Sequence, residues 1–279
     1  MEHIRYREYK ILLKSERFFN PEQFKVYWNK IRAVADRHKV KVHENKDAFR
    51  RQVREVLFFD TRSHDLYKNS FIMRSRTFYK DGWPEPDQEL TFKFRHRDRD
   101  AAASMDMTPS LSGGIKIKFK EEILPLANEL GGMCSLYSHN CVLVSPSLDL
   151  SAGIERIASI VPAIGSVAVS AGCPKIKLVN DFPVKEVQVN VGTLDFGHGL
   201  AAKATIAVWR DRISETPIVG EFAYQAKFDR YDLVHSKAKA RSEEFFKDVQ
   251  LHTADWVKLG STKTALVYSR GALAAVGNE

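Results

Sequence analysis

Basic residues recur at every second position in several segments of this chain, with aromatic or aliphatic residues between them. In the segment 89–97, Lys93 and Arg95 alternate with Phe92 and Phe94. A period of two predicts β-strands that bury an apolar face and present a second face, here a basic one, on the opposite side. The same period predicts strands at 4–14, 54–60, 71–79, 89–97, 115–122, 184–191, 201–210, 219–228 and 264–269.

Three segments have the apolar spacing of helices instead. Residues 21–38 begin at Asn20-Pro21-Glu22, which supplies an N-cap, a proline at the first helical position and an early acid. Shorter helices are expected at 242–251 and 152–162. Residues 131–180 carry the weakest pattern, so we expect a single domain over 1–279 with an insertion at 131–180.

The basic faces fall on more than one strand. Arg74 and Arg76 share one face of their strand, as Lys93 and Arg95 do. Like charges on neighbouring strands are destabilising unless they are compensated, and a bound polyanion with a divalent metal is one such compensation. A solvated outer face with lysines that protect a sheet edge is the alternative. The net charge of +8 agrees with an anionic partner but does not identify one.

Several other classes of protein are not favoured. The first residues, 1–8, contain no apolar run, and the charge-poor stretches 130–148 and 157–174 are interrupted by Ser, Gly or Pro. The three cysteines, Cys134, Cys141 and Cys173, have neither the number nor the spacing of a disulfide framework or a zinc site. We therefore expect a cytoplasmic protein without a membrane span.

Several segments, in this order, resemble motifs of the CYTH, or triphosphate tunnel metalloenzyme, superfamily. The first is Tyr6-Arg7-Glu8-Tyr9-Lys10, where the family has Glu-x-Glu-x-Lys. The later ones are Phe58-Phe59-Asp60-Thr61, Met73-Arg74-Ser75-Arg76, Thr91-Phe92-Lys93-Phe94-Arg95, Lys118-Phe119-Lys120-Glu121-Glu122-Ile123 and the strand 221–228, which begins with Glu221. The resemblance covers most of residues 4–125 and 200–270.

This resemblance implies an α+β fold in which an antiparallel β-barrel with peripheral helices encloses a tunnel. It implies that inward cations bind a triphosphate or polyphosphate, and that inward carboxylates bind Mg²⁺ or Mn²⁺. Carried over residue by residue, the phosphate-binding candidates are Lys10, Arg74, Arg76, Lys93, Arg95 and Lys118, and the metal-binding candidates are Glu8, Glu122 and Glu221. No catalytic residue is assigned.

The chain departs from the family pattern mainly in its acids. Tyr6 stands in place of the first Glu of the opening motif, and Lys120 in place of an acid. The phosphate-binding half of the site is therefore better preserved than the metal-binding half. The leading hypothesis is a metal-dependent hydrolase of triphosphate or polyphosphate. A catalytically weakened protein that binds or senses a phosphorylated ligand is the alternative, and a module that binds nucleic-acid phosphates is the least favoured.

Overall fold

A β-barrel forms the centre of the molecule. The computed structural model describes residues 3–111, 115–145, 153–172 and 174–276. Its strands are β1 (Tyr6–Leu13), β2 (Lys41–Glu44), β3 (Gln52–Thr61), β4 (Phe71–Lys80), β5 (Trp83–His96), β6 (Ile115–Leu124), β7 (Cys134–Ser145), β8 (Ile176–Leu178), β9 (Val184–Asp195), β10 (Ala201–Asp211) and β11 (Pro217–Lys227). They pair in the order β2-β9-β10-β11-β1-β6-β7-β5-β4-β3-β8.

The barrel closes because β9 also pairs with β3. The closed ring runs from β9 through β10, β11, β1, β6, β7, β5 and β4 to β3, while β2 and β8 extend the sheet outside it. All these pairings are antiparallel except the one between β1 and β6, which is parallel. The predicted α+β barrel with peripheral helices is confirmed, with this one parallel pair.

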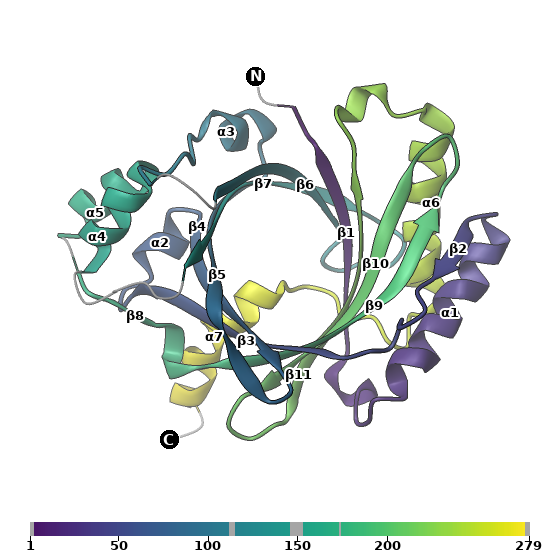
Figure 1. Ribbon diagram of the computed structural model, residues 1–279, viewed down its shortest axis with the longest axis horizontal. Helices are drawn as coiled ribbons and strands as arrows, with labels where there is room; N and C mark the ends of the chain where they lie inside the picture. Colours follow the sequence, from purple (N-terminus) through teal and green to yellow (C-terminus); the bar gives the residue numbers. More distant parts are fainter. Residues whose placement is uncertain (1–2, 112–114, 146–152, 173, 277–279) are drawn as a thin grey trace.

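Helices lie around the barrel (Figure 1), and the start of α7 reaches its interior. They are α1 (Gln23–Arg37), α2 (Asp65–Lys68), α3 (Arg99–Ser104), α4 (Gly153–Ile160), α5 (Gly165–Ser170), α6 (Ser236–His252) and α7 (Lys263–Val276). In Figure 1, which looks along the barrel, α1 and α6 lie on one side, and α4 and α5 on the opposite side. The helices predicted at 21–38, 152–162 and 242–251 correspond to α1, α4 and α6.

The alternation along β1 separates the core from the barrel interior. Tyr9, Ile11 and Leu13 are buried in a cluster with residues of α1 and α6. Glu8 and Lys10, at the intervening positions, line the interior. A strand with period two has to divide its side chains in this way, so burial of the apolar set outside the barrel turns the charged set inward.

The segment 264–269, predicted as a strand, is part of helix α7. Its buried residues are Thr264, Val267 and Tyr268, and the spacing of three and four residues between them is helical. Thr262 Oγ1 accepts a hydrogen bond from the backbone N–H of Ala265 at 3.1 Å, which satisfies one of the free donors at a helix start. The short run of β-branched and aromatic residues concealed this spacing.

Strand β7 lies within the stretch 131–180 that we expected to be an insertion. It pairs with β5 on one side and with β6 on the other, so it is an integral part of the barrel. The remainder of the stretch includes α4 and α5, which pack beside the barrel. The domain boundaries stay a prediction, but residues 134–145 do not belong to an insertion.

Cysteine pairing and membrane helices were both disfavoured by the sequence. Cys134 and Cys141 are free thiols, the first exposed and the second buried, and Cys173 lies outside the described residues. In the ranges given above, no helix combines the length and apolarity needed to cross a bilayer.

Asp60, at the end of β3, organises the turn that leads into α2. Its carboxylate accepts backbone N–H bonds from Thr61 at 2.7 Å, Leu66 at 2.9 Å and Tyr67 at 3.0 Å. It also accepts the hydroxyl of Tyr268 at 3.0 Å, which attaches α7 to the barrel. Burial raises the pKa of this carboxyl, although the backbone N–H groups act in the opposite direction. Asp60 therefore has a structural role.

We expect Asp60→Ala to lower the free energy of unfolding by about 3 kcal/mol, because several buried donors lose their shared acceptor. Urea denaturation followed by circular dichroism measures the change. Asp87→Ala is the matched control, because Asp87 is exposed on β5 and its removal should alter stability by no more than about 0.5 kcal/mol. Equal stability of the two variants would show that Asp60 does not connect β3, α2 and α7.

Candidate functional site

The barrel encloses a cavity of about 1230 Å³, called the lumen below. Its lining contains many more cations than anions. The cations are Lys10, Arg54, Arg74, Arg76, Lys93, Arg95, Arg97, Lys120, Lys203, Lys258 and Lys263. The carboxylates are Glu8, Glu122, Glu186 and Glu221. The lining therefore has eleven basic residues against four acids, a net excess of seven positive charges.

One wall of the lumen is organised around Glu122, whose side chain is 2% exposed. Its carboxylate binds Lys10 Nζ at 3.2 Å and Arg95 Nη2 at 3.3 Å, and it also pairs with Lys93. Glu8 lies directly across the parallel β1–β6 pair from Glu122. We call Glu122 and its neighbours on this wall, which are Glu8, Lys10, Lys93, Arg95 and Lys120, the Glu122 cluster.

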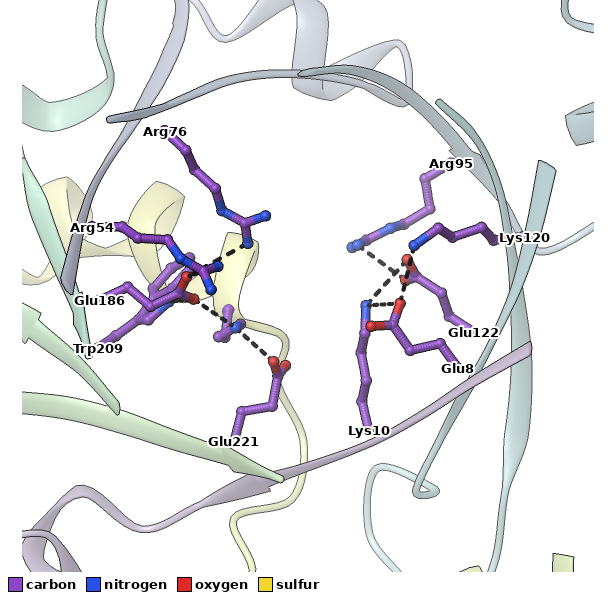
Figure 2. Close-up of polar contacts among 11 residues, drawn as sticks. Glu8, Lys10, Arg54, Arg76, Arg95, Lys120, Glu122, Glu186, Trp209 and Glu221 are labelled. Atoms are coloured by element: carbon purple, nitrogen blue, oxygen red, sulfur yellow. Dashed lines mark hydrogen bonds and ion pairs between the residues drawn. The ribbon is translucent and has the colours of Figure 1, made fainter. Parts of the chain in front are cut away.

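The facing wall is organised around Glu186, whose side chain is 1% exposed. Its carboxylate accepts hydrogen bonds from Arg54 Nη1 at 3.0 Å and Trp209 Nε1 at 2.7 Å. Arg76 and Lys263 approach the same carboxylate to 3.8 and 3.4 Å. We call these five residues the Glu186 cluster. Figure 2 labels the members of the two clusters except Lys93 and Lys263, and shows the two groups facing each other across the lumen.

Ion pairing keeps Glu8, Glu122 and Glu186 ionised. Burial alone would raise the pKa of Glu8, but Lys10 and Lys120 outweigh it and lower the pKa to about 2. Burial opposes ionisation of Glu122 and Glu186 in the same way, and their basic neighbours again lower the pKa. These carboxylates are therefore charged at neutral pH and neutralise part of the basic lining.

Two lumenal cations are less well compensated. Burial and the neighbouring Arg76 lower the pKa of Arg74 to about 9, and Arg74 has no ion pair among the described residues. Burial and Arg95 lower the pKa of Lys93 well below its ordinary value of 10.5, despite the contact with Glu122. Both shifts indicate that the lumen favours an additional negative charge near these two side chains.

Most of the predicted site residues do meet inside the barrel. Lys10, Arg74, Arg76, Lys93 and Arg95 all line the lumen. Lys118 is not part of the lining; its Nζ lies 5.7 Å from the centre of the Tyr6 ring. Of the three acids, Glu8 and Glu122 are neighbours, whereas Glu221 pairs with Lys263 at 2.6 Å in the opposite part of the lumen. The roles of these residues in binding stay predictions.

Sequence reasoning found Arg76 but missed the other members of the Glu186 cluster. In β9, Glu186 and Gln188 face the lumen, whereas Val189 and Val191 pack in the outer core; this alternation was a usable signal for Glu186. Lys185, the basic residue noted in that strand, pairs with Glu215 at 2.9 Å and is not part of the lumen lining. Lys263 could not be found in the same way, because it is the first residue of α7 and lies just before the segment 264–269 that we predicted as a strand.

The lumenal acids do not match the ligand set of a divalent metal. Among the described residues, no three His, Cys, Asp or Glu side chains come together in a way that could hold a metal ion. Each lumenal carboxylate instead contacts at least one Lys or Arg. Mg²⁺ requires oxygen ligands at about 2.1 Å in near-octahedral geometry, and here the carboxylate oxygens already contact ammonium and guanidinium groups.

The sequence matches no protein-family model and no curated protein. The structure does align with solved structures over nearly the full length of both chains. A candidate adenylyl cyclase from Hippeastrum, described as having a dominant triphosphatase activity, aligns with a TM-score of 0.43 and 12% identity over 95% of this chain and 96% of that chain. The PH1819 protein of Pyrococcus horikoshii aligns with a TM-score of 0.38 and 11% identity over 94% and 99%.

A candidate adenylate cyclase from Bacillus halodurans aligns with a TM-score of 0.37 and 9% identity over 94% of this chain and 97% of that chain. All three alignments extend over nearly the full length of both chains, at low sequence identity. The barrel itself is established by its strand pairing, described above.

We expect Glu186→Gln to lower the free energy of unfolding by about 3 kcal/mol, because it leaves Arg54, Arg76 and Lys263 without their shared counter-charge. The matched control is Glu215→Gln, which removes a 43% exposed carboxylate that pairs with Lys185 and Arg210. An exposed pair contributes about 1 kcal/mol or less. Urea denaturation of both variants measures the difference, and equal losses would contradict the central role of Glu186.

Proposed function

We propose that the lumen binds a triphosphate or a longer polyphosphate. The observation that carries this proposal is the excess of basic residues inside the barrel, eleven against four acids. The four acids are already ion-paired, and Glu89, outside the lining, adds a contact with Arg76 at 3.5 Å. A bound anion would supply further compensation. A compact anion with several charges supplies it in the available space.

The chemistry of the cations suits phosphate oxygens. Arg74, Arg76 and Arg95 offer planar guanidinium groups that can bind phosphate oxygens in bidentate fashion, and Lys10 and Lys93 add compact point charges. These groups come from β1, β4 and β5 and all line the lumen. Figure 2 shows three of them, Lys10, Arg76 and Arg95, projecting into the lumen from different sides. Nucleic acid is less favoured as a ligand, because these cations line a cavity rather than an exposed face.

Hydrolysis of the bound ligand stays a prediction, as do Mg²⁺ or Mn²⁺ as its cofactor and a cytoplasmic location. The resemblance seen in the sequence implies hydrolysis, and the lumenal cations would neutralise charge on the non-bridging oxygens. The arrangement of the carboxylates supports binding more directly than metal-dependent chemistry. Phosphate release from tripolyphosphate, ATP and thiamine triphosphate, with and without metal, distinguishes a hydrolase from a binding or sensor protein.

We expect Arg74→Ala and Lys93→Ala each to weaken tripolyphosphate binding by about tenfold or more, since each removes a charge-assisted contact. Isothermal titration calorimetry measures the affinity. Lys177→Ala is the matched control, because Lys177 is exposed on β8 outside the lumen. Circular dichroism checks that all variants stay folded.

Unchanged affinity in both lumenal variants would show that the ligand does not enter the barrel. Binding to any nucleic acid, with a steep dependence on salt and no preference for tripolyphosphate, would favour the nucleic-acid alternative instead.

The lowered pKa of Lys93 also predicts that binding depends on pH. Its pKa is lowered below 10.5 in the free protein, so the ammonium is lost as the pH rises through the lowered value. A bound polyanion stabilises the ammonium, so the complex keeps a proton that the free protein has released. Between the lowered pKa and 10.5, wild-type protein should therefore take up more protons per bound tripolyphosphate than Lys93→Gln.

Calorimetry in buffers of different ionisation enthalpy measures this uptake. Protons that the ligand itself exchanges contribute equally to both proteins, so the comparison isolates Lys93. Identical uptake at every pH from 7 to 11 would mean that Lys93 does not contact the ligand.

A further inference from the structure

The four lumenal carboxylates form two pairs, and a lysine ammonium bridges each pair. Lys10 Nζ lies 3.1 Å from Glu8 Oε2 and 3.2 Å from Glu122 Oε1. On the other side, Lys263 Nζ lies 2.6 Å from Glu221 Oε1 and 3.4 Å from Glu186 Oε2. Figure 2 shows the contacts of Lys10 with Glu8 and Glu122. A cation between two carboxylates is the position that a divalent metal would take.

The strand register explains the first bridge. The parallel pairing of β1 and β6 places Glu8 opposite Glu122, and two like charges at directly opposed positions are destabilising. Lys10 follows Glu8 by two residues, so its side chain projects from the same face of β1. Its ammonium contacts both carboxylates and removes the repulsion without any bound ion. Burial alone would lower the pKa of Lys10, but Glu122 and Glu8 raise it.

The remaining neighbours also oppose a divalent ion. Glu122 is bound by Lys93 and Arg95 in addition to Lys10, and Glu8 is approached by Lys120 at 3.6 Å. A metal in this position would face four cations within the same cluster and only two carboxylates. In the Glu186 cluster, the positive charges of Arg54 and Arg76 likewise oppose a divalent ion at the position of Lys263.

We infer that the lumen takes its polyphosphate as the metal-free anion, with the ammonium groups of Lys10 and Lys263 in the places where divalent metals would bridge the carboxylates. This inference rests on the proposed function for the identity of the ligand. It departs from the metal requirement that the sequence resemblance implies. Because Mg²⁺ removes negative charge from the ligand, it should compete with the lumenal cations and weaken binding.

Tripolyphosphate titrations of the wild-type protein test whether the ligand binds as the free anion or as its metal complex. We expect binding in EDTA to be at least as tight as in low Mg²⁺, and about tenfold weaker when Mg²⁺ saturates the ligand. Binding that disappears in EDTA and returns with Mg²⁺ or Mn²⁺ would overturn the inference. Absence of binding under every condition would instead overturn the proposed function. The metal titration below would then still test whether the carboxylates bridged by lysine accept a divalent metal.

Direct Mn²⁺ titration, followed by electron paramagnetic resonance, tests the two bridges without any phosphate ligand. We expect no stoichiometric Mn²⁺ binding by the wild type. Lys10→Glu should acquire one site, because it removes the bridging ammonium and adds a third carboxylate beside Glu8 and Glu122. The matched control Lys203→Glu makes the same charge change elsewhere in the lumen, on β10, and should acquire none.

Stoichiometric Mn²⁺ binding by the wild type that Glu122→Gln abolishes would overturn the inference. So would equal Mn²⁺ binding by folded Lys10→Glu and Lys203→Glu, since it would reflect lumenal charge alone. Thermal denaturation confirms folding, and Lys10→Gln serves as the bridging variant if Lys10→Glu is unfolded, because it also removes the ammonium from between the two carboxylates.

Discussion

The barrel depends on the neutralisation of the cations that its strand register turns inward. Glu122 on β6 binds cations from β1 and β5, and Glu186 on β9 binds cations from β3, β4 and the start of α7. Two buried carboxylates thus connect strands that are distant in sequence. A buried cation without a partner is strongly destabilising, so this pairing is a condition for enclosing so many basic side chains.

The outer surface of the same strands supplies the apolar burial. Residues of β1, β10 and β11 pack against α1 and α6, and a second cluster joins β4 and β5 to α4 and α5. Successive residues of a strand face opposite sides. Alternate positions can therefore serve charge pairing inside the barrel and apolar burial outside it. Trp209 lies on the lumenal side of β10: its ring packs against Phe58, which also lines the lumen, and its indole N–H donates to Glu186. The inner charge arrangement is therefore fixed by the outer packing.

The strands with regular alternation could be predicted from sequence, and with them the inward direction of Lys10, Arg74, Arg76, Lys93 and Arg95. The partners of these residues could not. Arg54 meets Glu186 only because β3 pairs with β9, and the two residues are 132 positions apart. Strand β7 was missed because polar residues such as Ser138, His139 and Asn140 are buried in it, which removes the alternation. The alternation of residue types shows which residues share one face of a strand. Which residues of different strands become neighbours inside the barrel depends on how the sheet closes.

Lysine and a divalent metal place different demands on a pair of carboxylates. A metal requires several oxygen ligands in fixed directions and at short distances. An ammonium donates three hydrogen bonds on a flexible stem and tolerates varied geometry. Glu8 and Glu122 on paired strands, and Glu186 and Glu221 on strands separated by β10, differ in relative placement, yet each pair is bridged by one lysine. The carboxylates are thus satisfied internally, but the cations of the lining outnumber them. Arg74, which has no ion pair among the described residues, and Lys93, whose pKa is lowered despite its contact with Glu122, remain for the anion.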